Sequence, residues 1–442
     1  MSRLSRVAAA LAVALGAATL SADVPKGIET FDAAWKIVRD THFDKTFNGV
    51  DWDAVRTEFR PKAEAAVSVG ELRGVIGAML SRLGQSHFAI VPASPDETAP
   101  ASGGTAPGRD TSADTGFDVR LMGRDVIVTA VEPGRGAAAA GVRPGWRLVA
   151  IGDTQVGDFL KAVPDSTNDR LRGLQAWRLM QARLRGSDTS TADLSFEDAA
   201  GRLVTRSVER QAEKGLPVKV GSLPTMFVRV TDAEKKTPAG RRAGLIAFNV
   251  WMAQVDAPFA RAVDKYRAAD GMVIDLRGNP GGLAAMMMGL SGHFVAERKP
   301  LGIMKTRDNE LKFVANPRTV DASGQPVAVY GGPVAILVDG MSGSASECFA
   351  GGMQSIGRVR VFGQTTMGQA LPALFDKLPN GDVMIHAYGD FVTADGTRLE
   401  GRGVVPDEPT PLAREDLLEG RDRALEAALS WIDRSAERGK SR

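Results

Sequence analysis

The sequence is poor in cysteine and histidine, which many metal sites and catalytic mechanisms use. Its 442 residues include one cysteine, Cys348, and four histidines, His42, His87, His293 and His386. A single cysteine excludes an intrachain disulfide and a multi-cysteine zinc or iron–sulfur site. A mechanism that needs a base with a pKa near neutrality therefore has few candidate residues.

The charge balance and the composition exclude several further classes of protein. A net charge of +2 gives no electrostatic argument for a nucleic acid as the main partner. With 43% hydrophobic and 24% charged residues, the chain has the composition of a globular protein. It is not typical of a disordered chain, a collagen or a polytopic membrane protein. At about 150 residues per domain, the length predicts about three domains.

The first residues have the pattern of an export signal. A basic start precedes an apolar run at residues 7–18, which is shorter than the roughly 20 residues of a comfortable membrane span. Small residues predict cleavage after Ala18 or after Ala22, and an uncleaved anchor is the alternative. We assign a signal peptide to residues 1–22 and expect a secreted or periplasmic protein without a stable membrane span after cleavage.

Residues 23–92 show the spacing of amphipathic helices. Apolar residues recur three and four positions apart in three stretches: Phe31, Trp35 and Val38; Trp52, Val55 and Phe59; Leu72, Ile76 and Met79. This spacing predicts three helices that bury one face each, and hence an N-terminal helical domain. Residues 93–113 are rich in Pro, Gly, Ser, Thr and Ala, which predicts a mobile linker.

Residues 114–212 change to strand patterns and contain TGFDV at 115–119 and AGVRPGWRLVAIGD at 140–153. These segments resemble a PDZ domain of the bacterial protease type. The resemblance implies capture of peptide C-termini, with backbone N–H groups at Gly116 and Phe117 receiving the carboxylate. A helix over 170–185 would line the groove. A generic β-rich insert is the alternative.

Apolar strands alternate with helical stretches in residues 213–411, which predicts an α/β core. The expected strands are 244–250, 272–276, 334–338 and 359–363. Residues 412–442 are expected to form a C-terminal helix, with its charged body over 414–437.

Three segments of this core carry candidate chemistry. The first, GMVIDLRGNPGG at 271–282, ends a strand in a Gly-rich turn whose N–H groups favour an anion. A phosphate site competes with this interpretation, although no P-loop lysine follows. The second, at 334–363, places a serine near a helix start that can stabilise an oxyanion, or simply cap the helix. The third, DGTRLEGRGVVPDE at 395–408, contains Glu400, which by itself would most often be a solvated charge.

Together, DLRGNPGG, SASE and EGRGVVPD in this order resemble the family of C-terminal processing (tail-specific) peptidases and the tricorn core protease. The resemblance covers essentially the chain that follows the signal. It implies a ClpP/crotonase-like α/β protease core with a helical N-terminal domain and an inserted PDZ domain. It also implies a serine nucleophile, which in this sequence is Ser344, and no metal or organic cofactor.

The sequence departs from the processing-peptidase branch at the position of the catalytic base. That branch has a lysine 25 positions after the nucleophile, where this chain has Gln369. An amide does not titrate near neutral pH and cannot take the proton of the serine. The acidic residue expected 11 positions after the nucleophile is replaced by Ser355. The nearest downstream lysine, Lys377, belongs to an expected hairpin turn.

The tricorn branch offers another base. It carries a Ser-His pair after a helix and a glutamate before a Gly-Val-x-Pro-Asp motif, and the matching residues are Ser86, His87 and Glu400. The resemblance implies that His87 is the general base and acid, and that Glu400 and Ser86 orient it. A capping or core histidine is the alternative for His87. The other three histidines match no motif of the family.

The resemblance also implies an oxyanion hole. Its donors would be the N–H of Ala345 and one from the Gly281–Gly282 turn, and loss of such a donor typically raises the barrier by about 3 kcal/mol. Cys348, four residues past the serine, is expected to be a buried residue, because catalytic thiols need an activating partner.

These expectations describe an exported serine endopeptidase that hydrolyses peptide bonds in unfolded or C-terminal segments of proteins. Its partners would be polypeptide substrates and no nucleic acid, and an oligomer is compatible with the sequence. The alternative is a catalytically inactive protease homologue that acts as a PDZ peptide-binding protein. A third hypothesis, a dyad that uses Lys377, requires activity to persist without His87.

Overall fold

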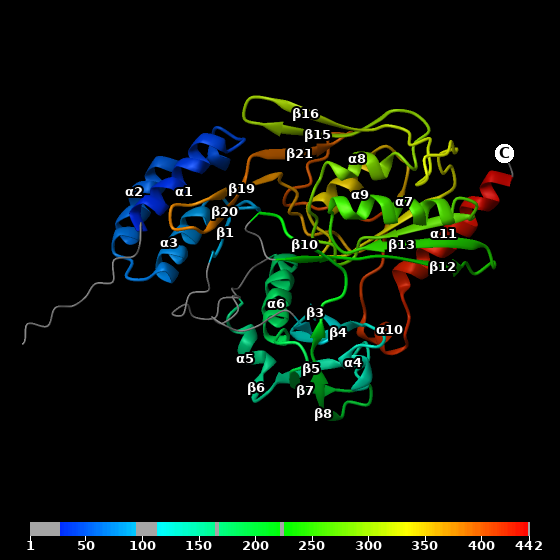
Figure 1. Ribbon diagram of the computed structural model, residues 1–442, viewed down its shortest axis with the longest axis horizontal. Coiled ribbons are helices and arrows are strands. Elements are labelled where there is room, and N and C mark those ends of the chain that lie inside the picture. Colours follow the sequence, from blue (N-terminus) through cyan, green and yellow to red (C-terminus); the bar gives the residue numbers. More distant parts are fainter. Residues whose placement is uncertain (1–26, 94–112, 164–167, 222–224, 441–442) are drawn as a thin grey trace, which may run out of the picture.

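The computed structural model describes residues 27–93, 113–163, 168–221 and 225–440 (Figure 1). The predicted signal peptide and residues 94–112 of the predicted linker lie outside the described residues. None of the helices in the described ranges is long and apolar enough to cross a membrane.

The N-terminal region consists of three helices that share one core. They are α1 (Gly27–Thr41), α2 (Trp52–Glu64) and α3 (Val69–Ser81), with a 3-10 turn η1 (Phe47–Gly49) after α1. The side chains of Asp51 and Ser68 accept hydrogen bonds from backbone N–H groups at the starts of α2 and α3, which fixes where these helices begin. The apolar stripes seen in the sequence are buried against one another, so the three predicted helices are confirmed.

Strand β1 (Ala89–Val91) joins this helical region to the rest of the molecule. It pairs antiparallel with β20 (Val383–Ala387), which in turn pairs with β19 (Ala373–Lys377). Arg73 of α3 makes a two-pronged ion pair of 2.8 and 2.9 Å with the buried Asp382. These contacts hold the residues that directly precede β1 against the core.

The middle region has a sheet and a hydrophobic core of its own. The strand order is β3 (Phe117–Met122), β4 (Asp125–Val131), β5 (Arg147–Ile151), β7 (Thr191–Glu197) and β8 (Leu203–Glu209), with β6 (Thr154–Gln155) beside β5. The shorter elements are β2 (Ala113–Asp114), paired with β9 (Gln211–Ala212), and helices α4 (Gly136–Ala139) and α5 (Val156–Leu160). Helix α6 (Asp169–Leu184) lies along the edge strand β3, as expected for residues 170–185.

The core of the C-terminal region is a six-stranded sheet. Its order is β12 (Val230–Lys236), β13 (Arg242–Phe248), β14 (Gly271–Asp275), β17 (Val334–Val338), β18 (Arg360–Gly363) and β22 (Glu408–Pro409). Only β12 runs antiparallel to its neighbour, and all five residues of β17 are buried, as is typical of a central parallel strand. The α/β core and the four predicted strands are confirmed, with ends that differ by up to two residues.

Helices cover both faces of this sheet. One face packs against α7 (Asp256–Lys265), α8 (Met286–Ser291) and α9 (Ala345–Ser355), and the other face packs against α11 (Arg423–Lys440) (Figure 1). The remaining elements are η2 (Ala253–Val255), the β10–β11 pair (Leu216–Val218 and Met226–Val228), and the sheet of β16 (Glu310–Ala315), β15 (Lys299–Thr306) and β21 (Gly389–Thr393).

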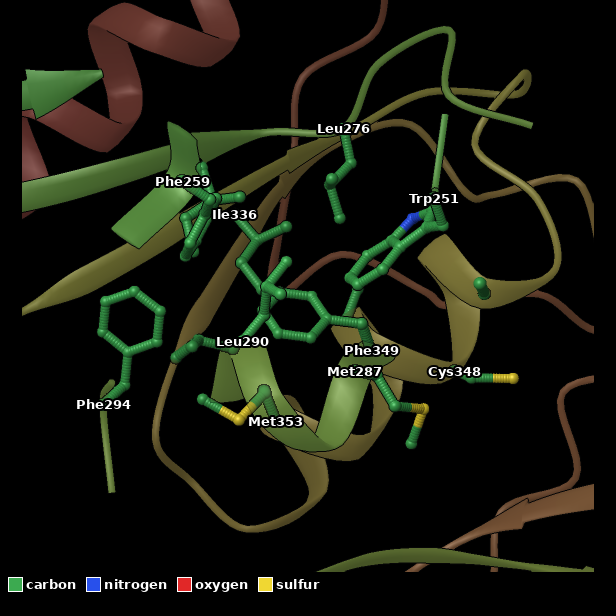
Figure 2. Packing of buried hydrophobic residues seen from close by; sticks show 14 of the residues in the cluster. Trp251, Phe259, Leu276, Met287, Leu290, Phe294, Ile336, Cys348, Phe349 and Met353 are labelled. Atoms are coloured by element: carbon green, nitrogen blue, oxygen red, sulfur yellow. The ribbon is translucent and has the colours of Figure 1, made fainter. Parts of the chain in front are cut away.

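The packing around α9 ties the start of this helix to the turn after β14. Figure 2 shows Trp251 and Phe349 side by side, with ring centroids 5.2 Å apart. The indole Nε1 of Trp251 donates to Ser346 Oγ at 2.9 Å, and this hydroxyl donates to the backbone oxygen of Asn279 at 3.0 Å. The first turn of α9 is thus anchored to the Gly-rich turn that the sequence singled out.

The C-terminal end differs from the single helix expected over 414–437. The structure has two helices, α10 (Arg414–Leu418) and α11. Gly420 interrupts them with a φ of 70°, a conformation that commonly ends helices. Asp422 then accepts from the N–H of Leu425 at 3.1 Å and caps α11. The charged composition of this segment did not reveal the break.

Candidate active site

Ser344 occupies a strained position at the N-terminus of α9. Its backbone has φ 51° and ψ −117°, which non-glycine residues rarely adopt and which occurs preferentially at functional sites. The neighbouring Ser342 is used differently, because its Oγ donates to the backbone oxygen of Leu276 at 2.7 Å and accepts from the N–H of Asp339. Of these two serines, only Ser344 leads directly into the helix.

The Gly-rich turn after β14 lies directly against Ser344. A Cβ added to Gly281, whose φ is 104°, would lie 2.6 Å from Ser344 Cβ and 2.9 Å from the backbone nitrogen of Ala345. The N–H of Gly281 already donates to Asn279 Oδ1 at 3.0 Å. Within the described ranges, the N–H groups of Ala345 and Gly282 have no acceptor. Two of the three residues predicted for the oxyanion hole therefore retain an available donor.

Glu347, one turn into α9, organises the surroundings of Ser344, and the sequence analysis missed this residue. Its carboxyl group is buried and accepts hydrogen bonds from the backbone N–H groups of Ser344 (3.0 Å), Gly368 (2.7 Å) and Gln369 (2.9 Å), and from Thr366 Oγ1 (2.5 Å). Burial raises the pKa of Glu347 to about 7. The four hydrogen bonds lower this pKa, but their effect is smaller than that of burial. The spacing Ser-x-x-Glu at a helix start was the available signal.

Ser86, His87 and Glu400 form one hydrogen-bonded chain. The Glu400 carboxylate accepts from the Ser86 N–H at 2.8 Å and from Ser86 Oγ at 2.9 Å, and Ser86 Oγ lies 2.7 Å from His87 Nδ1. His87 has a φ of 60° and lies two residues before the start of β1. The structure thus brings together three residues that are separated by up to 314 positions in the chain.

A two-residue backbone segment connects this chain to the serine. The oxygen of Gln369 accepts from the Ser344 N–H at 2.9 Å, and the N–H of the next residue, Ala370, donates to Glu400 Oε2 at 2.9 Å. Across the described ranges no direct hydrogen bond joins His87 to Ser344. Such bonds often tighten only when substrate is bound.

The environment keeps His87 neutral. Burial, together with the charge of Arg178, lowers the pKa of His87 to about 4. Burial also raises the pKa of Glu400, against three hydrogen bonds and Arg398 that favour its ionised form. Since Ser86 Oγ donates to Glu400, it can only accept from His87 Nδ1, which must carry the proton. The lone pair on His87 Nε2 is then available to accept a proton.

The middle region docks onto this site through α6 and β3. Arg170 of α6 donates to the backbone oxygens of Thr366 (2.6 Å), Gly401 (2.9 Å) and Arg402 (2.8 Å). Leu174, one turn further, packs with Met341 and Met367. From β3, Arg120 pairs with Asp339 at 3.1 Å in the turn before Ser344.

The predicted peptide-binding loop is partly occupied by the chain itself. The N–H of Gly116 donates to Asp114 Oδ1 at 2.7 Å, and Arg135 also binds this carboxylate at 2.6 Å. Phe117 is buried at the start of β3. A peptide carboxylate at this loop would have to compete with Asp114 for the donor at Gly116.

The other three histidines, Cys348 and Lys377 lie outside the hydrogen-bonded chain of Ser86, His87 and Glu400. His42 binds the oxygen of Asp44 and Gln85 Oε1, and His386 binds Thr41 and Asp376. His293 is fully buried, and neither ring nitrogen has a partner among the described residues. Cys348 is buried, as predicted, and burial raises the pKa of its thiol. Lys377 ends β19 before a turn, as predicted.

Comparison with known proteins agrees with this architecture. Residues 242–410 match peptidase family S41, and residues 29–81 match the tricorn protease C1 domain. The carboxyl-terminal-processing protease of Picosynechococcus sp. is 26% identical over 385 residues, covering 86% of this chain and 82% of that protein. The chloroplastic carboxyl-terminal-processing peptidase 3 of Arabidopsis thaliana is 25% identical over 398 residues, with 86% and 68% covered.

Among solved structures, the photosystem II D1 C-terminal processing protease has the same fold. Its TM-score is 0.57 at 22% identity, and the likeness covers 92% of this chain and 99% of that one. The fold, the family match and the relatives define this chain as a serine-type peptidase that acts on protein substrates. Its residues 242–410 are similar to peptidase family S41, and the relatives that it resembles are carboxyl-terminal-processing proteases.

Proposed function

We propose that the chain is an exported endopeptidase in which Ser344 is the nucleophile and His87 the base. The observation that carries this proposal is the chain of hydrogen bonds from Glu400 through Ser86 to His87 Nδ1. This chain leaves His87 Nε2 as the proton acceptor. The Gln369–Ala370 segment links the chain to Ser344, because it hydrogen-bonds to both Ser344 and Glu400. Gln369 stands where a lysine base would be required, which disfavours the alternative dyad.

The reaction follows from these positions. Ser344 Oγ attacks the carbonyl carbon of the substrate and its proton passes to His87 Nε2, while Ser86 and Glu400 stabilise the imidazolium. The N–H groups of Ala345 and of the Gly281–Gly282 turn, where Gly282 has the available donor, stabilise the oxyanion. His87 then returns the proton to the leaving amine, and water hydrolyses the acyl-enzyme by the same steps. No step needs a metal or an organic cofactor.

We also infer that residues 114–212 form a PDZ domain inserted between a helical domain at 23–92 and a ClpP/crotonase-like protease core at 213–411. The antiparallel sheet with α6 along its edge strand β3 supports this inference. In this proposal, the groove between β3 and α6 holds an unfolded or C-terminal segment of the substrate. Export is tested by N-terminal sequencing of the mature protein, which we expect to begin after Ala18 or Ala22.

The experiment for the catalytic site is labelling with a serine-directed fluorophosphonate at pH 7–8, combined with casein hydrolysis. Wild-type protein and a Ser355→Ala control should react stoichiometrically, whereas Ser344→Ala should show neither labelling nor cleavage while remaining folded. Ser355 is a fair control because its Oγ donates only within α9, to Gly352 at 2.8 Å. Cleavage by purified Ser344→Ala refutes the proposal, and so does activity retained by His87→Ala. Peptide binding without labelling would favour the inactive homologue.

A further inference from the structure

Arg178, in the middle of α6, is a cation without a counter-ion among the described residues. Its side chain is exposed, and within the described ranges it makes no ion pair or hydrogen bond. Desolvation by the surrounding protein lowers its pKa, and no carboxylate in the part of the chain that the structure describes offsets this effect. Two other arginines at the same interface are fully engaged, since Arg120 pairs with two carboxylates and Arg170 donates to three carbonyl oxygens.

The helical register places Arg178 on the face of α6 that docks near the catalytic residues. Arg170, Leu174 and Arg178 are four positions apart, so they share one face of α6. Arg170 lies on the loop that contains Thr366, and Leu174 packs on Met341 and Met367 beside Ser344. The next turn along this face carries Arg178, whose charge acts on His87.

This placement opposes the proposed chemistry when no anion is present. A positive charge near His87 disfavours the imidazolium that forms when the serine proton is transferred. Two carboxyl groups face this region: Glu400, which lies behind Ser86 and interacts with the charge of Arg398, and Glu347, which lies beyond the 366–369 loop. Neither of them pairs with Arg178. An anion supplied from outside the chain would therefore both bind Arg178 and favour protonation of His87.

The predicted carboxylate loop of the middle region does not offer an equivalent site. Its Gly116 N–H is occupied by Asp114, and the nearest arginine, Arg135, is buried and already bound to Asp114 and to two backbone oxygens. The cation whose charge acts on His87 is Arg178 on α6.

We infer that Arg178 binds a carboxylate of the polypeptide substrate next to the scissile bond, and so acts as a residue that determines specificity. This inference rests on the proposed function, because it assigns a substrate preference to the same site. The carboxylate can come from an acidic side chain or from the substrate C-terminus, and the two sources share the same chemistry. The pairing anchors the substrate and cancels the charge that opposes the imidazolium.

The experiment begins by mapping the cleavage sites of β-casein by mass spectrometry. A fluorogenic peptide that spans one preferred site is then made with Glu or Gln at the preferred acidic position, and with a free or amidated C-terminus. Wild-type enzyme should cleave the carboxylate form about tenfold faster in kcat/KM than its amide counterpart, as expected for a charge-assisted hydrogen bond. Whichever pair shows the difference identifies the source of the carboxylate.

The variants separate a specific role from a structural one. Arg178→Gln should lose the preference, Arg178→Lys should keep part of it, and the control Arg172→Gln, on the same helix, should keep all of it. Arg172 has no charged partner in the described ranges and is not among the charges that act on His87. In addition, Arg178→Gln should raise the pKa of His87, so the acidic limb of its kcat/KM profile should move to higher pH.

Each outcome is decisive. The inference is overturned if wild-type enzyme cleaves carboxylate and amide peptides equally, or if Arg178→Gln slows both forms by the same factor. It is also overturned if Arg178→Gln leaves both the preference and the pH profile unchanged. If wild-type enzyme cleaves no form and Ser344 is not labelled, it is the proposed function itself that fails.

Discussion

Gly281→Ala tests whether the Gly-rich turn and the serine form one packed unit. The added methyl group would lie 2.6 Å from Ser344 Cβ and 2.8 Å from the oxygen of Gly343, well inside contact distance. Holding alanine at the left-handed φ of 104° costs about 1–2 kcal/mol, and the overlap costs about 1–3 kcal/mol more. We therefore expect the free energy of unfolding to fall by about 2–5 kcal/mol.

The effect on activity should be larger than the effect on folding. The overlap can be relieved only by moving the turn away from Ser344, and a displacement of about 1 Å can reduce the rate by about 100-fold. The assays are urea unfolding, the rate of fluorophosphonate labelling, and peptide hydrolysis under conditions where the variant is folded.

A matched control is Gly289→Ala in α8. A Cβ at this position meets nothing closer than Asp256 Oδ1 at 4.0 Å, so alanine should stabilise the helix by about 0.5–1 kcal/mol and leave labelling unchanged. If Gly281→Ala is labelled as fast as wild type and unfolds at the same urea concentration, the packing argument is wrong.

Four further outcomes are expected. His293→Leu should stabilise the protein and reduce its loss of stability in acid. Burial lowers the pKa of His293 to about 4, so this residue destabilises the fold as the pH falls from about 6.5 to 4. If urea unfolding shows the same dependence of stability on pH in the variant and the wild type, this reasoning is wrong. The kcat/KM of the wild type should not decline until the pH approaches the His87 pKa of about 4, and a decline centred near pH 6.5 would be inconsistent with its surroundings. Ser86→Ala should reduce kcat by about 100-fold or more with little change in KM, because the imidazole loses its orienting partner; an unchanged kcat would remove Ser86 from the mechanism. Arg170→Met should weaken the docking of α6 and increase protease nicking between the middle region and the core, which limited proteolysis would detect; unchanged nicking would show that the three backbone contacts are dispensable.

Sequence patterns were sufficient for the parts of this protein that depend on local periodicity or on motifs. The apolar stripes of the N-terminal helices and the buried run at 334–338 each determine their own secondary structure. The motifs likewise pointed to Ser86, His87 and Glu400, which the structure brings into one hydrogen-bonded chain.

What the sequence could not reveal depends on chain segments that fold back on one another. Three of the four partners of Glu347 become visible only when the 366–369 loop covers the start of α9. Similarly, the docking of Leu174 on two methionines follows from tertiary packing. The expectation of a single charged helix over 414–437 also failed at Gly420, since a single backbone conformation ended the helix there.

The pairing of Ser86 with Glu400 spans 314 positions of the chain and has a consequence for synthesis. The proposed base emerges from the ribosome first, and the glutamate that orients it emerges almost last. A nascent chain that already contains Ser344 still lacks Glu400, so its imidazole has no fixed tautomer and β1 has no partner strand in place until β20 is made. Proteolytic competence should therefore appear only near the completion of translation, which protects the cell that makes the enzyme while the chain is being synthesised.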